Sequence, residues 1–138
     1  MVRDRVLIID DDPDLRELIA LGLDSLHLTA VEAACCTEAL PLLERERARL
    51  RAVLLDYFMP GVSPAACAAA VLARVDPGVP VVLVSAAVDI AERAAELGLT
   101  RYLAKPFDLS ELHALVQAPP SEPPSEPASE PPSELDTG

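Results

Sequence analysis

The sequence predicts an α/β domain with a doubly wound, parallel sheet of five strands, arranged as (βα)5. Two observations predict this fold. Short, uninterrupted apolar runs alternate with segments of helical periodicity, five times in succession up to about residue 117. The apolar runs lack the in–out alternation of a half-exposed strand, which indicates strands buried on both faces. Strict alternation of strands and helices places helices on both faces of a parallel sheet, joined by right-handed crossovers.

The expected strands are short apolar runs, and all but the second end beside a polar residue. In chain order they are residues 6–9, 28–33, 52–55, 79–84 and 102–104. The expected helices begin at cap residues or prolines, near residues 12, 37, 63, 89 and 108. Asp12 is placed as an N-cap with Pro13 at the first helical position. Asp108 and Glu111 have the spacing of a capping box, and Gly98 ends the fourth helix.

The composition changes sharply at Ala118. Pro-Pro-Ser-Glu recurs at positions 119, 123 and 131, with Pro-Ala-Ser-Glu at 127. This repeat has almost no apolar side chains and cannot cover a core. We therefore expect one folded domain over residues 1–117 and a disordered, acidic tail over residues 118–138.

The charge of the chain argues against a nucleic-acid partner. Its net charge is -12, whereas nonspecific DNA binding depends on basic residues that neutralise phosphates. The one basic cluster, residues 45–51, is interleaved with glutamates, and we interpret it as a solvated helix face. No signal-peptide core or membrane-length apolar run is apparent, so we expect no membrane partner and a cytoplasmic location.

The spacing of the cysteines does not indicate a disulfide or a metal site. There are three of them, Cys35, Cys36 and Cys67, and no pair has C-x-x-C spacing. We therefore expect neither a disulfide framework nor a zinc site. Cys67 lies in an apolar helix, where it is expected to act as a small core residue.

Polar side chains follow four of the expected strands at the point where each strand ends. They are Asp10 with Asp11, Asp56, Ser85 and Lys105. In open parallel sheets, ligands bind outside the carboxyl ends of the strands, so these residues are expected to meet at one edge.

Three carboxylates gathered at one edge repel each other, and a cation relieves that repulsion. Mg²⁺ prefers carboxylate oxygens and phosphate, and a carboxylate can act as the nucleophile that forms an aspartyl phosphate. Lys105 is the only lysine among 11 basic residues, and its ammonium can neutralise a phosphoryl oxygen. The pattern therefore predicts Mg²⁺-assisted phosphoryl transfer.

The chain resembles the receiver domain of bacterial two-component response regulators over residues 4 to about 117. Four motifs carry the resemblance. They are Ile9-Asp10-Asp11-Asp12-Pro13, Leu54-Leu55-Asp56-Tyr57-Phe58-Met59-Pro60-Gly61, Leu83-Val84-Ser85-Ala86 and Tyr102-Leu103-Ala104-Lys105-Pro106-Phe107. Each motif alone is weak, but their order and their places at strand ends are specific. The resemblance implies a flavodoxin-like strand order of 2-1-3-4-5.

The resemblance also implies site roles. Asp56 would accept a phosphoryl group from a phosphohistidine on a histidine kinase or phosphotransfer protein. Asp11 would be the main Mg²⁺ ligand, supported by Asp10, by Asp56 and by the main-chain carbonyl of Phe58.

The same resemblance implies a switch in which Ser85, alongside Lys105, bonds a phosphoryl oxygen and Tyr102 swings with the Ser85 loop. The chain would catalyse only its own phosphorylation and dephosphorylation, and it would signal through contacts with a downstream protein.

The chain departs from the usual family pattern at two positions that help to govern hydrolysis of the acyl phosphate. Phe58 lies two residues after the acceptor and Ala87 lies two residues after Ser85. Neither side chain can orient an attacking water, so we expect slow self-dephosphorylation. The interval from Ser85 to Lys105 is also short, which predicts a reduced fourth helix.

Two alternatives remain open from the sequence. A receiver fold can act as a binding module without being phosphorylated. A phosphatase similar to the haloacid dehalogenases could use Asp10-Asp11-Asp12, Ser85 and Lys105. That interpretation leaves the Asp56 motif unexplained and lacks an acidic pair after Lys105.

Overall fold

The computed structural model describes residues 2–59 and 61–117, and it confirms the expected fold class and strand order. The sheet is parallel, with five strands in the order β2-β1-β3-β4-β5. The strands are β1 (Arg5–Ile9), β2 (Thr29–Ala33), β3 (Leu50–Asp56), β4 (Val81–Ser85) and β5 (Arg101–Ala104). The helices are α1 (Pro13–Asp24), α2 (Cys36–Glu46), the 3-10 turn η1 (Arg47–Arg49), α3 (Pro64–Leu72), α4 (Ile90–Glu96) and α5 (Leu109–Gln117). The predicted tail lies outside the described residues.

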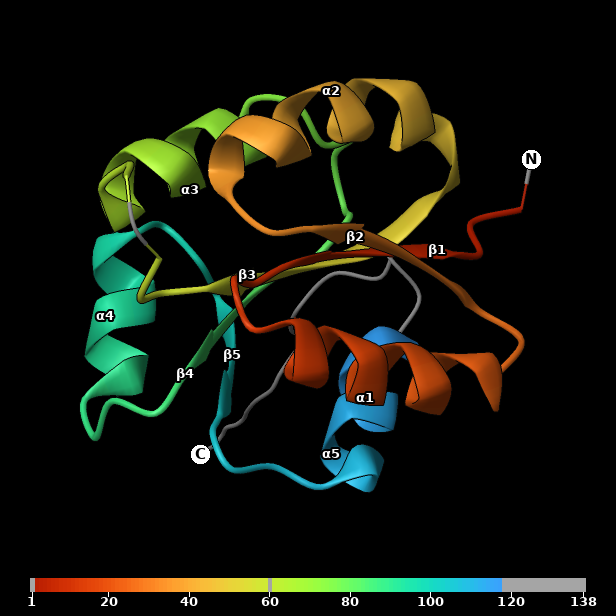
Figure 1. The fold of residues 1–138 in the computed structure, drawn as a ribbon. Helices are drawn as coiled ribbons and strands as arrows, with labels where there is room; N and C mark the ends of the chain where they lie inside the picture. The colour runs from red at the N-terminus through yellow and green to blue at the C-terminus, as the bar shows by residue number, and fades with distance from the viewer. Residues whose placement is uncertain (1, 60, 118–138) are drawn as a thin grey trace, which may run out of the picture.

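The sheet separates two apolar layers (Figure 1). α1 and α5 lie side by side on one face, and α2, α3 and α4 cover the other. Successive residues of a strand point to opposite faces, so Leu7 and Ile9 of β1 join one layer while Val6 and Ile8 join the other. This burial on both sides explains why the strand sequences are uniformly apolar.

The predicted helix signals act as expected. The Asp12 carboxylate accepts hydrogen bonds from the backbone N–H groups of Asp14 and Leu15 and caps α1. Asp108 and Glu111 exchange side-chain-to-backbone hydrogen bonds of 3.0 Å, which is the reciprocal pattern of a capping box. α4 has 7 residues, in line with the reduced helix expected there. No helix in the described residues is long and apolar enough to cross a membrane.

The interpretation of residues 45–51 as one solvated helix face is wrong. Its arginines fall in α2, η1 and β3, because the helix ends at Glu46 and β3 begins at Leu50, earlier than expected. Arg47 bonds Asp76 at 2.6 Å, and Arg49 bonds Asp4 at 3.0 Å. These arginines are therefore partners in ion pairs at the amino ends of the strands.

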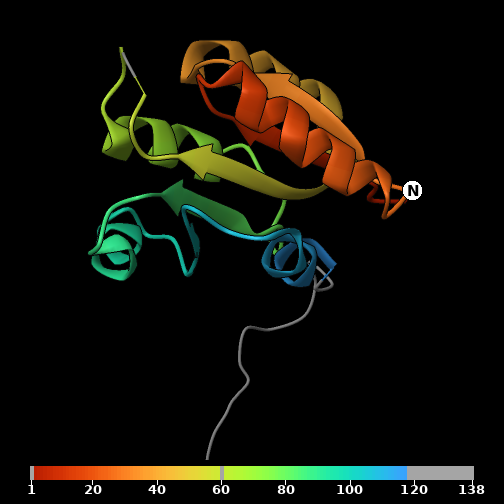
Figure 2. The same cartoon turned by 60° about the horizontal axis from the view of Figure 1, so that its bottom comes forward.

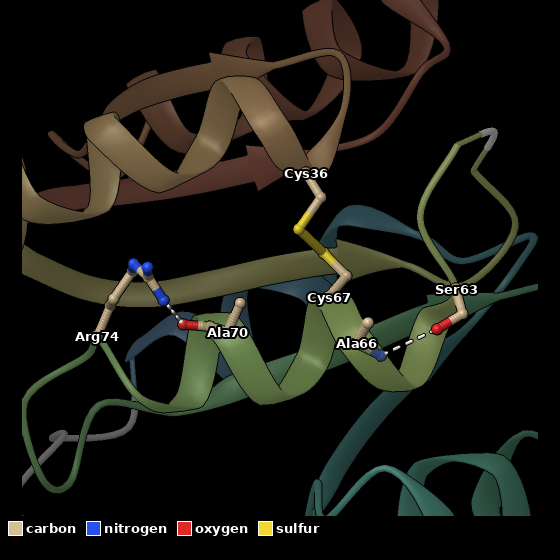
Figure 3. Close-up of a disulfide and its surroundings, with 6 residues drawn as sticks. All are labelled: Cys36, Ser63, Ala66, Cys67, Ala70 and Arg74. Atoms are coloured by element: carbon tan, nitrogen blue, oxygen red, sulfur yellow. Dashed lines mark hydrogen bonds between the residues drawn. A yellow bond between two sulfur atoms is a disulfide. The ribbon is translucent and has the colours of Figure 1, made fainter.

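The expectation that the cysteines form no disulfide is also wrong. Cys36 and Cys67 are joined by a disulfide, with their Cα atoms 6.0 Å apart (Figure 3). Cys36 is the first residue of α2 and Cys67 lies in the first half of α3. The sequence hid this pair because the two residues are 31 positions apart, and only the packing of α2 beside α3 on one face brings them together. Cys35 is free and partly exposed.

Candidate functional site

The predicted acidic residues meet at the carboxyl edge of the sheet. Asp10 and Asp11 follow β1, and Asp56 is the last residue of β3, the strand beside it. Figure 2 shows the arrowheads of β3 and β4 pointing the same way, so the loops that follow these strands leave from the same edge. One carboxylate oxygen from each of Asp10, Asp11 and Asp56 lies within 4.8 Å of the other two. Parallel pairing therefore brings together residues separated by up to 46 positions, from Asp10 to Asp56.

Lys105 bridges two of these carboxylates. Its Nζ lies 3.2 Å from Asp10 Oδ2 and 3.2 Å from Asp56 Oδ1. The backbone carbonyl of Ser85 accepts from the Lys105 N–H at 2.8 Å, which fixes the start of the loop that carries the ammonium. Asp10 is further held, because its Oδ1 accepts from the Asp12 N–H at 2.9 Å. Among the described residues, Lys105 is the only hydrogen-bond donor to Asp56, and Asp56 Oδ2 accepts none.

The pKa of Asp56 and that of Lys105 are both raised at this edge of the sheet. Burial raises the pKa of Asp56 above its ordinary value, and the charges of Asp10 and Asp11 raise it further. The ammonium of Lys105 opposes this shift but does not cancel it. Burial by itself would lower the pKa of Lys105, but the charges of Asp56 and Asp10 outweigh burial, so that pKa is raised and the group stays charged. Two of the three carboxylates thus share the Lys105 ammonium, and the Arg16 guanidinium donates to the Asp10 carbonyl at 2.6 Å.

The donor set of this cluster fits Mg²⁺. Asp10 and Asp56 are buried while Asp11 is exposed, so the cluster opens to water on one side. Mg²⁺ binds through a few carboxylate oxygens and keeps several waters, which this half-open arrangement permits. A bound divalent cation would also remove the repulsion that raises the pKa of Asp56.

Ser85 is placed beside the cluster by its backbone, and its side chain accepts one hydrogen bond from the loop that follows it. The residue is fully buried at the end of β4, and its Oγ accepts from the Ala87 N–H at 3.1 Å. Ser85 pairs with Ala104 in the β4–β5 register, next to Lys105. Because a hydroxyl has one donor and two acceptor positions, Ser85 Oγ can still donate to a phosphoryl oxygen while it accepts from the Ala87 N–H.

Tyr102 and Phe58 lie at the surface. Tyr102 is on β5 and is 45% exposed, and Phe58, two residues after the end of β3, is 57% exposed. The hydrogen bonds of the described residues link neither side chain to the acidic cluster. Their predicted roles, including metal binding by the Phe58 carbonyl, stay predictions.

Sequence reasoning missed a contact between α4 and the residues after Asp56. The guanidinium of Arg93 lies 4.7 Å from the ring centre of Tyr57 and 5.8 Å from that of Phe58. Asp89 bonds Arg93 at 2.7 Å and holds it over the rings. The i, i+4 spacing of Asp89 and Arg93 predicts their ion pair, but nothing in the spacing identifies the aromatic partners.

Comparison with known proteins agrees with this geometry. Residues 6–117 match the family described as the response regulator receiver domain. The DNA-binding response regulator MtrA of Mycobacterium tuberculosis is 33% identical over 119 residues, covering 85% of this chain and 50% of that protein. The probable transcriptional regulator ycf27 of Porphyridium aerugineum is 30% identical over 120 residues, covering 86% of this chain and 48% of that protein. The chain thus spans about half the length of these relatives.

Solved structures show the same fold. The receiver domain of sensor histidine kinase PA1611 from Pseudomonas aeruginosa, which has a magnesium ion coordinated in its active-site cleft, superposes with a TM-score of 0.72 at 26% identity, covering 83% of this chain and 94% of that one. The chemotaxis protein CheY4 of Vibrio cholerae superposes with a TM-score of 0.66 at 21% identity, covering 82% of this chain and 95% of that one, and supports the fold alone. The chain belongs to the response regulator receiver-domain family of two-component signalling.

Proposed function

We propose that Asp56 accepts a phosphoryl group from a phosphohistidine on a histidine kinase or phosphotransfer protein, with Mg²⁺ held by Asp10, Asp11 and Asp56. One observation carries this proposal. The Asp56 carboxylate is buried between a lysine ammonium and two further carboxylates, with one of its oxygens free of hydrogen bonds to the described residues. A nucleophile needs such an unengaged oxygen, and phosphoryl transfer needs such charges around it.

The residues of the site divide the reaction between them. The free oxygen of Asp56 attacks phosphorus and forms a P–O bond. The P–N bond of the donor breaks, and its electron pair stays on the imidazole nitrogen. The Lys105 ammonium, 3.2 Å from Asp56 Oδ1, neutralises a phosphoryl oxygen as charge builds on it. Mg²⁺, when bound, supplies the remaining charge neutralisation at the phosphoryl oxygens.

The signal is proposed to leave through protein contacts. The Ser85 hydroxyl would donate to a phosphoryl oxygen, and the exposed Tyr102 would move with the loop that follows Ser85. The downstream target would be a protein in the cytoplasm. The domain proposed for these steps is residues 1–117, acting without a nucleic-acid or membrane partner and turning over no substrate other than its own phosphoryl group.

The test is phosphoryl uptake by the full chain, read by intact mass. With Mg²⁺ and a small acyl phosphate, the wild-type chain should gain the mass of one phosphoryl group, and it should gain none when Mg²⁺ is chelated. Asp56→Asn should gain none under either condition. Asp12→Asn is the matched control, because Asn caps a helix as well as Asp and the side chain of residue 12 only caps α1.

A wild-type chain that takes up no phosphoryl group would favour the binding-module alternative. The phosphatase alternative would require turnover of a generic phosphate ester by Asp56→Asn protein.

The lifetime of the phosphorylated chain tests a further expectation. Hydrolysis of the acyl phosphate should be slow, because Phe58 and Ala87 carry no group able to orient a water. A half-life at the fast end for receiver domains would contradict the expected slow hydrolysis.

A further inference from the structure

The disulfide between Cys36 and Cys67 joins two segments that both adjoin the acidic cluster. Cys36 follows the end of β2, where the Ala33 carbonyl accepts from the Asp10 N–H at 3.1 Å. Cys67 lies one turn into α3, and its N–H bonds the carbonyl of Ser63, the N-cap of that helix. The bond therefore ties the segment beside Asp10 to the helix that follows Asp56 (Figure 3).

Cys67 is also close to the acceptor. Together with Asp56, Tyr57 and Met59 it lines a small cavity beneath the end of β3. The residues between Asp56 and α3, here called the acceptor loop (residues 57–59 and 61–63), end at Ser63, which caps α3 by accepting from the Ala66 N–H at 3.1 Å. Restraint of α3 therefore restrains one end of the acceptor loop.

A permanent structural bond is not needed in this domain. Two apolar layers enclose the sheet, and domains of more than 100 residues commonly fold on such cores without disulfides. In the cytoplasm, where the domain is proposed to act, thiols are kept reduced and disulfides are usually transient or redox-sensing. A bonded pair that flanks the site is therefore better explained as a reversible modification.

We propose that Cys36 and Cys67 form a reversible oxidation site whose oxidant is a low-molecular-weight disulfide, and that the bonded form restrains the acceptor loop. The coupling to Asp56 rests on the proposed function, whereas the thiol chemistry does not. Cys36 is the more exposed residue of the pair, at 5% against 2% for Cys67, and we assign it the first attack.

The exchange balances as two successive displacements. The Cys36 thiolate attacks one sulfur of the small disulfide, whose S–S bond breaks and releases one thiolate. The Cys67 thiolate then attacks Cys36 Sγ in the mixed disulfide and displaces the second small thiolate. Two electrons pass from the cysteines to the small disulfide, and the two protons of the cysteine thiols end on the released thiols.

The bonded form should bind Mg²⁺ more tightly. A restrained acceptor loop has less freedom to lose when a cation orders the acidic cluster. We expect the Kd for Mg²⁺ to be about fivefold lower in the oxidised chain, at the lower end of typical coupling between two sites. The bond also closes a long loop in the unfolded chain, which should raise the unfolding midpoint by roughly 10 °C.

The experiment uses the Cys35→Ser variant of the 138-residue chain, which removes the free, partly exposed cysteine and leaves the pair intact. The protein is equilibrated with glutathione and glutathione disulfide at a series of ratios, remaining thiols are trapped with N-ethylmaleimide, and adducts are counted by intact mass. Excess glutathione should give two adducts and excess glutathione disulfide none. A Cys35→Ser, Cys67→Ser variant should form no internal bond at any ratio. Mg²⁺ affinity, the unfolding midpoint and phosphoryl uptake are then measured on both redox forms.

The outcomes separate the two proposals. Two adducts at every ratio would overturn the oxidation site, whatever happens at Asp56. Bond formation with equal Mg²⁺ affinity in both forms would overturn the restraint of the acceptor loop. Absence of phosphoryl uptake in both redox forms would contradict the proposed function and leave the thiol count unchanged.

Discussion

The two ends of the sheet handle charge in opposite ways. At the amino ends of the strands, arginines and carboxylates are matched in ion pairs. These pairs are Arg3–Asp76, Arg47–Asp76, Arg49–Asp4 and Arg5–Glu46, with N···O distances of 2.6–3.0 Å. At the carboxyl ends, three carboxylates gather at one point, and Lys105 is the only side chain among the described residues that forms an ion pair with any of them.

The pKa directions follow this difference. Hydrogen bonds from Arg3 and Arg47 lower the pKa of Asp76 at the amino end, while burial and the neighbouring carboxylates raise the pKa of Asp56 at the carboxyl end. Charges that serve the fold are neutralised by the chain itself. Under the proposed function, the charges at the site are left for a cation and a phosphoryl group to neutralise, and local stability is lower as a result.

The largest expected effect is on phosphoryl uptake when Lys105, which forms ion pairs with Asp10 and Asp56, loses its ammonium group. Lys105→Ala should slow Mg²⁺-dependent uptake from an acyl phosphate about 100-fold, because an aligned charge at the developing oxyanion is lost. The rate is measured by intact mass over time. Arg101→Ala is the control on the same strand and should keep the wild-type rate. Equal rates for both variants would show that Lys105 takes no part in transfer.

Magnesium should stabilise the folded chain through the same carboxylates. At a Mg²⁺ concentration of 100 times Kd, the free energy of unfolding should rise by about 2.7 kcal/mol, measured by urea denaturation. Asp11→Asn should lose most of this increment because it removes one of the three oxygens. Asp14→Asn, in the first turn of α1, should retain it. An undiminished increment in Asp11→Asn would place the cation elsewhere.

Neutralising Asp56 should stabilise the chain when Mg²⁺ is absent. Because its folded pKa is raised, the stability that the protonated carboxyl contributes is present at low pH and is lost as the pH rises through the folded pKa. Asp56→Asn should therefore raise the free energy of unfolding at pH 7 by about 1 kcal/mol. The difference should shrink as the pH falls toward 3.8. If Asp56→Asn instead destabilised the chain at pH 7, the attraction of the Asp56 carboxylate to Lys105 would have to outweigh its burial and its repulsion from the other carboxylates.

The smallest effect is expected at the amino end, and its sign is opposite. Asp76 has a lowered pKa, so its ion pairs contribute stability above the ordinary carboxyl pKa, and this contribution is lost as the pH falls through the lowered value. Asp76→Asn should lower the unfolding midpoint slightly, because exposed ion pairs contribute little. The decrease should fade in high salt, and thermal unfolding at two salt concentrations measures it. A higher midpoint in Asp76→Asn would contradict charge matching at this end.

The carboxyl end could be predicted from the sequence because its geometry follows from strand order. Asp10, Asp56 and Lys105 each end or follow a buried strand, and parallel pairing places all such positions at one edge. Knowing where each apolar run ends in the sequence is therefore enough to predict that these residues meet.

The features that sequence reasoning missed depend on side-chain directions across helices and loops. The Cys36–Cys67 bond needs the first turns of α2 and α3 to face each other, and Arg93 needs α4 to reach the ring of Tyr57. The arginine pairs of the amino end need the helix before β3 to stop at Glu46. No glycine marks the end of α2, and the approach of one helix to another is set by packing across the core and not by a local pattern.

The most direct test of the imbalance between the two ends is the titration of the Asp56 side-chain carboxyl, followed by carbon NMR in the full chain without Mg²⁺. The predicted result is a pKa above 3.8 that falls when Mg²⁺ is added. A pKa at or below 3.8 in the absence of Mg²⁺ would mean that Lys105 alone neutralises the carboxyl end, and it would contradict a site built to receive a cation.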